Sequence, residues 1–362
     1  MQGSFWAITL LVTKVYSSFD CSFNSTYPKQ YVAHRAKAIA IDGVLDDQVW
    51  KSSKFTDDFV DISTTVVPRL KTNVKMAWDD DYLYIGAVLE EPDIWANITS
   101  VCHCNNSTND QVIFHDNDFE VFVDADGSTH NYKEFEMNAA NQDWVLLLNR
   151  PYADGGGENS TRVYGTDGFD IVGRKHAVSI KGKLNDINSV NKQWSVEIAF
   201  PLQQLYQLNA ASHPKDGDFW RINFSRVEYH VAKEFGEYVK TNPVEDNWVW
   251  SPQGEIAMHL PERWGILQFS TSTRFDTPPK YYDEWQIRSI AMELYYNLHS
   301  FRDANGFFTN DVSLLNNPAF GCAGSIFVAN STDRFTGYIN SVDQQYYAII
   351  DDLRFLQVFK RE

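Results

Sequence analysis

The most constraining feature of this chain is a long series of short runs rich in β-branched and aromatic residues, from about residue 39 to residue 269. Clusters of Asp, Asn and Gly separate the runs, as turns separate strands. Residues 72–78 and 82–89, for example, flank the acidic turn 79–81 and predict an antiparallel hairpin. Short strands at this spacing favour a sandwich or barrel over a βαβ fold. We expect further strands at 119–123, 133–138, 144–148, 177–184, 194–200, 219–229 and 265–270, and one helical turn at 201–206.

The pattern changes near residue 274, where Thr277-Pro278-Pro279 indicates a linker. An apolar stripe with helical spacing then predicts a helix at about 283–302, which Asp283 and Gln286 would begin as a capping box. Four β-rich runs follow it, at 325–329, 336–342, 346–351 and 354–360. We therefore expect a β domain over residues 35–272 and a small α+β domain over residues 280–362.

Charge narrows the classes of partner. The chain carries 48 Asp and Glu against 31 Lys and Arg, for a net charge of −17. Nucleic acid and anionic membrane surfaces both need a basic surface, so neither is an expected partner. An acidic surface is compatible with a neutral sugar or a divalent cation. Whether a protein partner exists does not follow from the composition.

The N-terminal segment predicts export. Residues 5–12 are apolar but too few to span a bilayer, so residues 1–18 are interpreted as a signal peptide. No later segment is apolar enough for a transmembrane helix. N-x-S/T triplets, which are glycosylation acceptors in secreted chains, begin at Asn24, Asn97, Asn105, Asn106, Asn159, Asn223 and Asn330. We expect a secreted glycoprotein.

The cysteines agree with an oxidising compartment. The chain has four of them, Cys21, Cys102, Cys104 and Cys322. The run Cys102-His103-Cys104 has poor spacing for a zinc site, because two ligands one residue apart rarely share an ion. One or two disulfides are the better expectation.

Two acidic turns are candidates for calcium. Asp124 and Asp126 precede Gly127 at a strand end, where two carboxylates could face one hard cation. Asp79 and Asp80 offer the same arrangement in the hairpin turn. The alternative for both is an ordinary acidic turn without an ion.

Several polar or aromatic residues share a strand face. Glu120 and Phe122 would lie on one face of a strand that turns Phe119 and Val121 to the other, and Glu136 and Asn138 lie two residues apart. A carboxylate beside an amide suits vicinal sugar hydroxyls, and it suits a solvated face almost as well. Further on, Trp248 and Trp250 would share a face. That pair could form a stacking platform for a sugar or fill the core.

The motifs together resemble family 9 carbohydrate-binding modules. The match runs over about residues 35–270, through the "DGxLDxxxW" opening at 42–50, the hairpin at 74–84, and the segments 118–124, 135–138 and 250–252. The chain is most similar to longer extracellular family 9-like proteins that carry a C-terminal helix and sheet. The resemblance implies an immunoglobulin-like antiparallel β-sandwich, stabilised by calcium, with two tryptophans that clamp one sugar.

The resemblance also implies a ligand site. Trp250 matches one clamp tryptophan, and Phe114 falls at the position of the other. Glu120 and Asn138 match polar sugar contacts, whereas Glu136 replaces an arginine and so removes a fork-shaped donor. Ser225 replaces a longer amide. The complete predicted carbohydrate-binding set is Trp250, Phe114, Glu120, Glu136, Asn138, Trp248, Ser225 and Arg226.

Three functions follow as hypotheses. The first is non-catalytic binding of an oligosaccharide or polysaccharide, with calcium as a structural cofactor. The second is a glycoside hydrolase in which Glu120 works with Glu136, or Glu228 works with a neighbouring acid. The third is an extracellular sandwich that binds a protein or haem, with candidate ligands Met137, His115, His230, Met258 and His259. We expect binding without catalysis.

Overall fold

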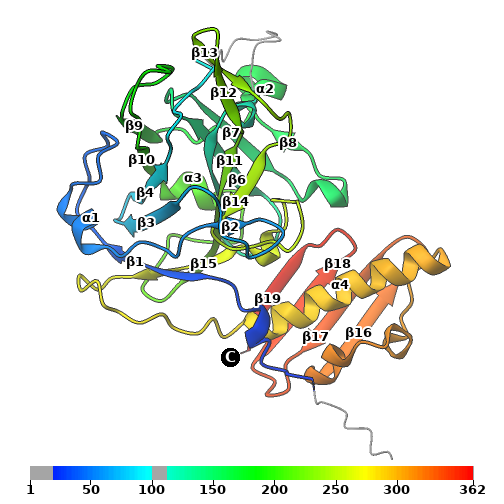
Figure 1. The fold of residues 1–362 in the computed structure, drawn as a ribbon. Helices are drawn as coiled ribbons and strands as arrows, with labels where there is room; N and C mark the ends of the chain where they lie inside the picture. Colours follow the sequence, from blue (N-terminus) through cyan, green and yellow to red (C-terminus); the bar gives the residue numbers. More distant parts are fainter. Residues whose placement is uncertain (1–18, 100–111, 362) are drawn as a thin grey trace, which may run out of the picture.

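The structure is a computed structural model that describes residues 19–99 and 112–361. A large β-sandwich occupies one end of the molecule (Figure 1). The helix α4 (Trp285–Asn305) and a separate antiparallel sheet occupy the other end. The predicted signal segment 1–18, the triplets at Asn105 and Asn106, and the run Cys102-His103-Cys104 lie outside the described residues.

One curled sheet forms the sandwich, and it confirms the mainly β prediction. Its strand order is β8-β7-β6-β5-β11-β15-β1-β3-β4-β10-β9, and β14 extends β11. Because β1 pairs in parallel with both β15 and β3, the sheet is not antiparallel throughout. The strands are β1 (Gln30–Arg35), β3 (Thr72–Trp78), β4 (Tyr82–Glu90), β5 (Asp118–Asp124), β6 (Tyr132–Asn138), β7 (Asp143–Leu148), β8 (Glu158–Asn159), β9 (Lys175–Lys181), β10 (Gln193–Pro201), β11 (Phe219–Glu228), β14 (Asp246–Val249) and β15 (Gly265–Ser270).

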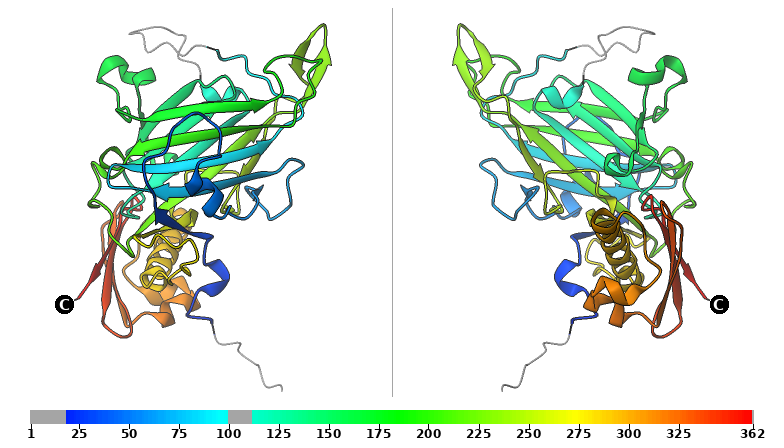
Figure 2. Two further views of the ribbon diagram at one scale, coloured as in Figure 1. Left: turned by 90° about the vertical axis from the view of Figure 1, so that its left-hand side faces the viewer. Right: turned by 90° about the vertical axis from the view of Figure 1, so that its right-hand side faces the viewer.

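Smaller elements decorate the sandwich. The helical turn predicted at 201–206 is observed as α3 (Leu202–Tyr206). The others are α1 (Gln48–Ser52), α2 (Thr161–Tyr164), the short strand β2 (Val60–Asp61), which pairs with β14, and the hairpin of β12 (Val231–Glu234) and β13 (Glu237–Lys240). Figure 2 shows that this hairpin projects from the sandwich at the end away from the C-terminal sheet.

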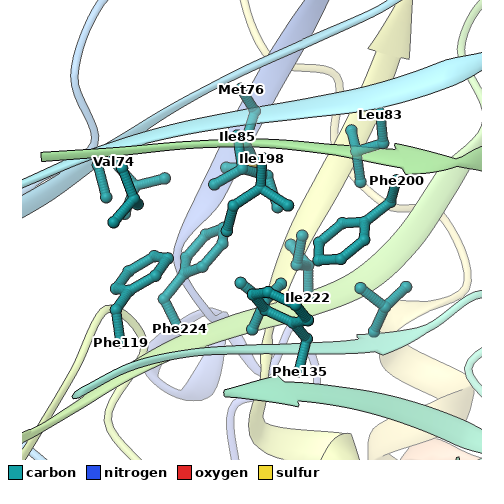
Figure 3. Packing of buried hydrophobic residues seen from close by; sticks show 14 of the residues in the cluster. Val74, Met76, Leu83, Ile85, Phe119, Phe135, Ile198, Phe200, Ile222 and Phe224 are labelled. Atoms are coloured by element: carbon teal, nitrogen blue, oxygen red, sulfur yellow. The ribbon is translucent and has the colours of Figure 1, made fainter. Parts of the chain in front are cut away.

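The core lies between the two halves of the curled sheet. Figure 3 shows side chains of β3, β4 and β10 facing side chains of β5, β6 and β11. Phe119 and Phe224 stack with their ring centroids 5.9 Å apart, and Phe135 meets Phe200 edge-on at 5.1 Å. These residues are buried to 1% exposure or less, so alternation along each strand directs every second residue into the apolar interior. The intervening residues must therefore lie on the outer face.

The C-terminal part has the predicted helix and sheet. The helix α4 packs on β16 (Ser325–Asn330), β17 (Phe335–Asn340), β18 (Tyr346–Asp351) and β19 (Leu356–Lys360), through its buried residues Ile290, Leu294 and Leu298. The predicted capping box is wrong, because the helix begins after Glu284 without a side-chain cap and the Gln286 amide donates to the Cys21 carbonyl instead.

Covalent and ionic contacts join this part to the sandwich. A disulfide links Cys21, just before β1, to Cys322, which is 301 residues later in the sequence, and it confirms the disulfide prediction. The buried Arg354 pairs with Asp154 and Glu262 of the sandwich side at 2.8 and 3.0 Å. The two parts therefore share a fixed boundary.

Two further observations concern the helices and the N-x-S/T triplets. In the described part of the chain, no helix is both long and apolar enough to cross a bilayer. Asn223 is fully buried and its amide donates to the Ser251 carbonyl, so this triplet has no room for a glycan. By contrast, Asn24, Asn97 and Asn330 are exposed.

Candidate functional site

Strand pairing gathers the predicted polar residues on the outer face of the sandwich. Glu120 on β5 lies opposite Glu136 on β6 and opposite Ser225 on β11. Asp118 lies opposite Asn138 one step along the same face. Because Phe119 and its alternate neighbours enter the core, these polar side chains all point away from it. The structure thus brings together four of the predicted site residues, and confirms that Glu120 and Phe122 share a face.

A cavity of about 250 Å³ opens over this face. Three carboxyl-bearing residues of the strands, Glu120, Glu134 and Glu136, form its floor together with Phe122, and Glu245 joins them from the segment before β14. Its remaining walls are aromatic or apolar for the most part, and the residues concerned are Phe114, Trp144, Leu146, Tyr152, Ile256, Met258 and His259. The cavity therefore combines several acceptor groups with large apolar surfaces.

The pKa values of the three strand carboxyl groups in this acidic pocket, Glu120, Glu134 and Glu136, are raised. Burial raises the pKa of Glu120 to about 7, and the charge of Glu245 raises it further while the hydroxyl of Ser225 lowers it. Burial, followed by the charges of Glu120 and Glu134, raises the pKa of Glu136 well above its ordinary value. Desolvation disfavours a charged carboxylate, and like charges add to the effect. The pocket consequently favours any ligand that brings positive charge or hydroxyl donors.

Three of the acids could also hold a metal ion. Carboxyl oxygens of Asp118, Glu120 and Glu136 lie within 4.8 Å of one another. Oxygens on opposite sides of a calcium ion stand about 4.6 to 5.2 Å apart, because each Ca–O bond measures about 2.3 to 2.6 Å. The three groups are all oxygen ligands, which hard cations such as calcium prefer.

Some polar atoms of the pocket have no partner among the described residues. They are Glu134 Oε2 and the indole Nε1 of Trp144, and Asp118 Oδ2, which lies on the same strand face outside the lining, has no partner either. Trp144 is only 6% exposed and lies opposite Glu136 across the β6–β7 pair. A buried donor or acceptor without a partner costs about 1 to 3 kcal/mol. A polar ligand in the pocket would recover part of that cost.

Phe114 and Asn138 have different roles. Phe114 is 37% exposed, and its backbone N–H donates to Glu136 Oε2 at 3.1 Å, which ties an accessible ring to the acidic floor. The prediction that Asn138 contacts the ligand is wrong for this geometry. Its amide nitrogen donates to the Ile98 carbonyl and Asp116, and its oxygen accepts from the backbone of 140 and 142. Asn138 therefore shapes the loop and has no spare group.

The predicted clamp tryptophan lies on the wrong side of the sheet. Trp250 is 1% exposed and packs in the core against Phe224, with ring centroids 5.9 Å apart. Trp248 is also in the core, where the Arg226 guanidinium lies 5.2 Å from its ring. The two tryptophans do share a face, but that face is the interior one. Neither can offer a ring to a sugar.

Arg226 is also absent from the pocket. Its side chain is fully buried in the interior, where it pairs with Glu91 at 2.9 Å and with Glu228 at 2.8 Å. Thr72 accepts a further hydrogen bond from it. The guanidinium is occupied by these partners, so the prediction that Arg226 binds the ligand is wrong.

The aspartates of the acidic turns accept hydrogen bonds from other groups of the protein. Asp124 is fully buried and accepts from the backbone N–H groups of Gly127 and Thr129, and burial raises its pKa to about 8. Asp126 accepts from Ser128 and Ala210. These contacts match the alternative of a structural turn.

The hairpin turn behaves in the same way. Asp79 accepts from the backbone of 81 and 82 and from the Tyr84 hydroxyl, and Asp80 pairs with Arg35. Calcium at these four aspartates stays a prediction, and the three-carboxylate group of the acidic pocket is a better placed candidate.

With this geometry established, comparison with known proteins is informative. Residues 41–212 match the family described as "Carbohydrate family 9 binding domain-like". Over these residues the chain is family 9 carbohydrate-binding-like. The matched residues include the strands β5 and β6 that carry Glu120 and Glu136. No curated protein matches the chain.

Solved structures are similar to this chain only at low sequence identity and low TM-score. A family 9 carbohydrate-binding module from Caldicellulosiruptor kristjanssonii, solved with cellotriose, is 15% identical over 70% of this chain and 100% of its own, with a TM-score of 0.42. The same description with glucose gives 14% identity over the same shares and a TM-score of 0.41. A protein from Bacteroides uniformis ATCC 8492, provisionally named as carbohydrate-binding, is 18% identical over 67% of this chain and 100% of its own, with a TM-score of 0.46.

Sequence reasoning missed several pocket residues of this family 9-like domain. Glu134 lies two residues before Glu136, so strand alternation alone places it on the same face. Trp144 could have been found by pairing the predicted hairpin 133–138 with 144–148. Tyr152 and Glu245 come from loops, and no local pattern indicates that they reach the pocket.

Proposed function

We propose that the protein binds a carbohydrate without cleaving it, in the acidic pocket of the sandwich. The observation that carries the proposal is that hydrogen-bond acceptors and aromatic rings line the same cavity. Buried acceptors lie beside accessible aromatic surface, and they lie on strands within the residues that match a carbohydrate-binding-like family. Sugar hydroxyls donate to carboxylates, while the C–H face of a pyranose packs on a ring.

Individual side chains of the pocket would make different contacts with the sugar. Glu120 and Glu136 accept from neighbouring hydroxyls, and the unpartnered Trp144 Nε1 donates to a sugar oxygen. The accessible ring of Phe114 takes the stacking role that the sequence analysis gave to a tryptophan pair. Since Glu136 replaces the arginine of the better-known modules, the pocket selects hydroxyl donors and disfavours anionic sugars.

Calcium is a further part of the proposal. We place it at the carboxyl oxygens of Asp118, Glu120 and Glu136, where it would neutralise three acids and could contact sugar hydroxyls directly. The unpartnered Oε2 of Glu134, at the same cavity, supports an occupant that attracts oxygen atoms. Calorimetric titration with calcium after chelation tests this placement, and Glu136→Gln should weaken binding about tenfold or more.

A glycan panel followed by calorimetry tests the sugar proposal. The Phe114→Ala variant should lose about tenfold or more in affinity, because it removes the stacking surface. Trp250→Phe is the matched control, and it should keep the affinity because its ring is in the core. Equal losses in both variants, or binding that Phe114→Ala leaves unchanged, would contradict the proposed pocket.

Glycoside hydrolysis is the second candidate. Acid pairs in retaining glycosidases stand about 5 to 5.5 Å apart, and the oxygens of Glu120 and Glu136 approach within 4.8 Å. The pKa of about 7 for Glu120 would suit a general acid. Glu228 has no such role, because it pairs with Arg226 and Arg69. Release of reducing sugar from a polysaccharide panel would favour this candidate over binding alone.

The haem alternative has no converging ligands. Met137 is in the core, while His115 and His230 are exposed at separate places. Met258 and His259 do line the acidic pocket, but none of the other three candidate ligands lines it with them.

We retain secretion as a proposal, supported by the exposed triplets at Asn24 and Asn97, and glycosidase treatment of the protein from a eukaryotic host tests it.

A further inference from the structure

A second and larger cavity lies where the sandwich meets the C-terminal part. It measures about 1150 Å³, and its walls come from the segment 19–29, from loops of the sandwich near residues 63–65, 251–254 and 261–263, and from α4. Figure 2 shows α4 beneath the sandwich, beside the segment that leads into β1. Its volume is that of a ligand site for a small organic molecule.

Arg221 is the unusual residue in this cavity. It lies on β11, on the same outer face as Ser225 but four residues towards the other end of the strand. Its side chain is buried, and its Nε and Nη2 donate to the backbone carbonyls of Pro261 and Glu262 at 3.4 and 2.6 Å. Its Nη1 has no partner among the described residues.

No carboxylate of the described residues forms an ion pair with Arg221. Burial lowers the pKa of its guanidinium to about 10, so the group is still charged at neutral pH. The other two arginines of the cavity differ from it, since Arg288 pairs with Glu284 and Arg263 pairs with Glu255. A buried charge without a counter-ion is costly, and a free donor on that charge adds to the cost.

The acids that line the cavity have other partners. The carboxylate of Glu262 pairs with Arg354 and accepts from the Tyr296 hydroxyl. Glu293 accepts from the amide of Asn317. Neither is within ion-pair distance of Arg221, so the described residues supply charge near the cavity but no direct counter-ion for the Nη1 atom.

One acceptor complements this donor. Gln253 lines the same cavity and is 1% exposed, and its Oε1 has no partner among the described residues while its Nε2 donates to the Ser251 carbonyl. The remaining walls are largely apolar, with Phe23, Trp285 and Met292 among them. The lining thus combines one unpartnered cationic donor, one unpartnered acceptor and apolar residues, among which the Trp285 ring lies 5.5 Å from the Arg221 guanidinium.

We propose that this cavity is a second ligand site, which takes a hydroxylated carboxylate of the size of a uronic acid. The carboxylate would meet Arg221 Nη1, a hydroxyl would donate to Gln253 Oε1, and the ring would pack towards Trp285. The site gives the C-terminal part a function, because α4 supplies one of its walls. It does not depend on the sugar proposal for the acidic pocket, whose charge has the opposite sign.

Titration of the whole disulfide-bonded chain by calorimetry tests the proposal. Glucuronate should bind, whereas glucose, which has the same ring without the carboxylate, should bind at this cavity at least about tenfold more weakly. Acetate and lactate test which part of glucuronate provides the affinity, because each has a carboxylate but no sugar ring. If lactate binds as tightly as glucuronate, the carboxylate part stands and the uronic-acid part is overturned.

Two variants locate the binding. Arg221→Gln should weaken glucuronate binding about tenfold or more, and Gln253→Glu, which leaves Arg221 in place, should weaken it as much by adding negative charge to the lining. Glu120→Gln, in the acidic pocket, is the control and should leave glucuronate binding unchanged. Binding that neither variant weakens, or the absence of any carboxylate binding to the wild-type chain, would overturn the proposal.

Discussion

The two cavities lie along one strand and carry opposite charge. Near Ser225 the outer face of β11 borders the three buried acids Glu120, Glu134 and Glu136, and four residues away, about 13 Å along the strand, it carries a buried arginine. In the interior, the buried Arg226 has Glu91 and Glu228 as partners. The difference teaches that the interior arginine of this strand is neutralised by carboxylates of the chain, whereas the outer-face arginine has no carboxylate partner among the described residues.

Arg226 should give the largest effect, because its neutralisation is internal. Arg226→Met leaves the buried Glu91 without its cation and Glu228 with Arg69 alone, and we expect a loss of about 3 to 5 kcal/mol in the free energy of unfolding. Arg221→Met removes a charge without a counter-ion and two hydrogen bonds to carbonyls, so its cost should be only about 1 to 2 kcal/mol. Urea denaturation of both variants makes the measurement. Equal costs would break the comparison.

Removal of the disulfide should affect the two cavities differently. Cys21→Ser together with Cys322→Ser opens a closed loop of about 300 residues, and we expect a loss of about 2 to 5 kcal/mol. The segment 19–29 lines only the larger cavity, so glucuronate binding should weaken. Sugar binding in the acidic pocket should stay unchanged in calorimetry at a temperature where the variant is folded. An equal decline of both affinities would show that the cavities do not act separately.

The acidic pocket makes stability depend on pH. The pKa of Glu120 is raised from its ordinary value near 4.5 to about 7, so between these values the folded chain binds a proton that the unfolded chain has released. Stability must therefore fall as the pH rises through this window. Glu91 and Asp124 add to the fall, since their pKa values are raised to about 8.

Substitution of Glu120 isolates its share of that dependence. Glu120→Gln should flatten the curve of melting temperature against pH between about 4.5 and 7, and should stabilise the protein by about 1 to 3 kcal/mol at pH 8. Asp124→Asn, at the turn, serves as the comparison because it loses hydrogen bonds to backbone N–H groups as well. A variant with an unchanged slope would show that the pKa of Glu120 is not raised in the folded chain.

The elements of this fold could be predicted from local pattern, but the orientation of their faces could not. Residues 72–78 and 265–270 were predicted with the observed bounds, since alternation and turn residues act locally. Alternation also showed that Trp248 and Trp250 share a face. Which face of a strand meets the core depends on the opposite sheet, so the pattern could not decide between platform and interior.

Partners distant in sequence account for the other misjudged residues. Asp126 turns towards Asn209 and Ala210, more than eighty residues away, and these donors occupy the oxygens that the sequence offered to calcium. Arg221 gives no signal in the sequence, because its significance comes from an Nη1 atom that folding leaves without a partner. A polar atom without a partner can be recognised only when the folded structure shows which atoms surround it.

The smallest effect is expected from a substitution of Trp144 in the acidic pocket. Trp144→Phe keeps an aromatic ring but removes the indole N–H, which has no partner among the described residues. Stability should change little, while sugar affinity in calorimetry should fall about threefold to tenfold if the N–H donates to the ligand. Trp78→Phe is the matched control, since its indole donates to the Ser270 carbonyl at 3.0 Å in the interior. That variant should lose stability and keep its affinity, and the reverse pattern would place the sugar outside the acidic pocket.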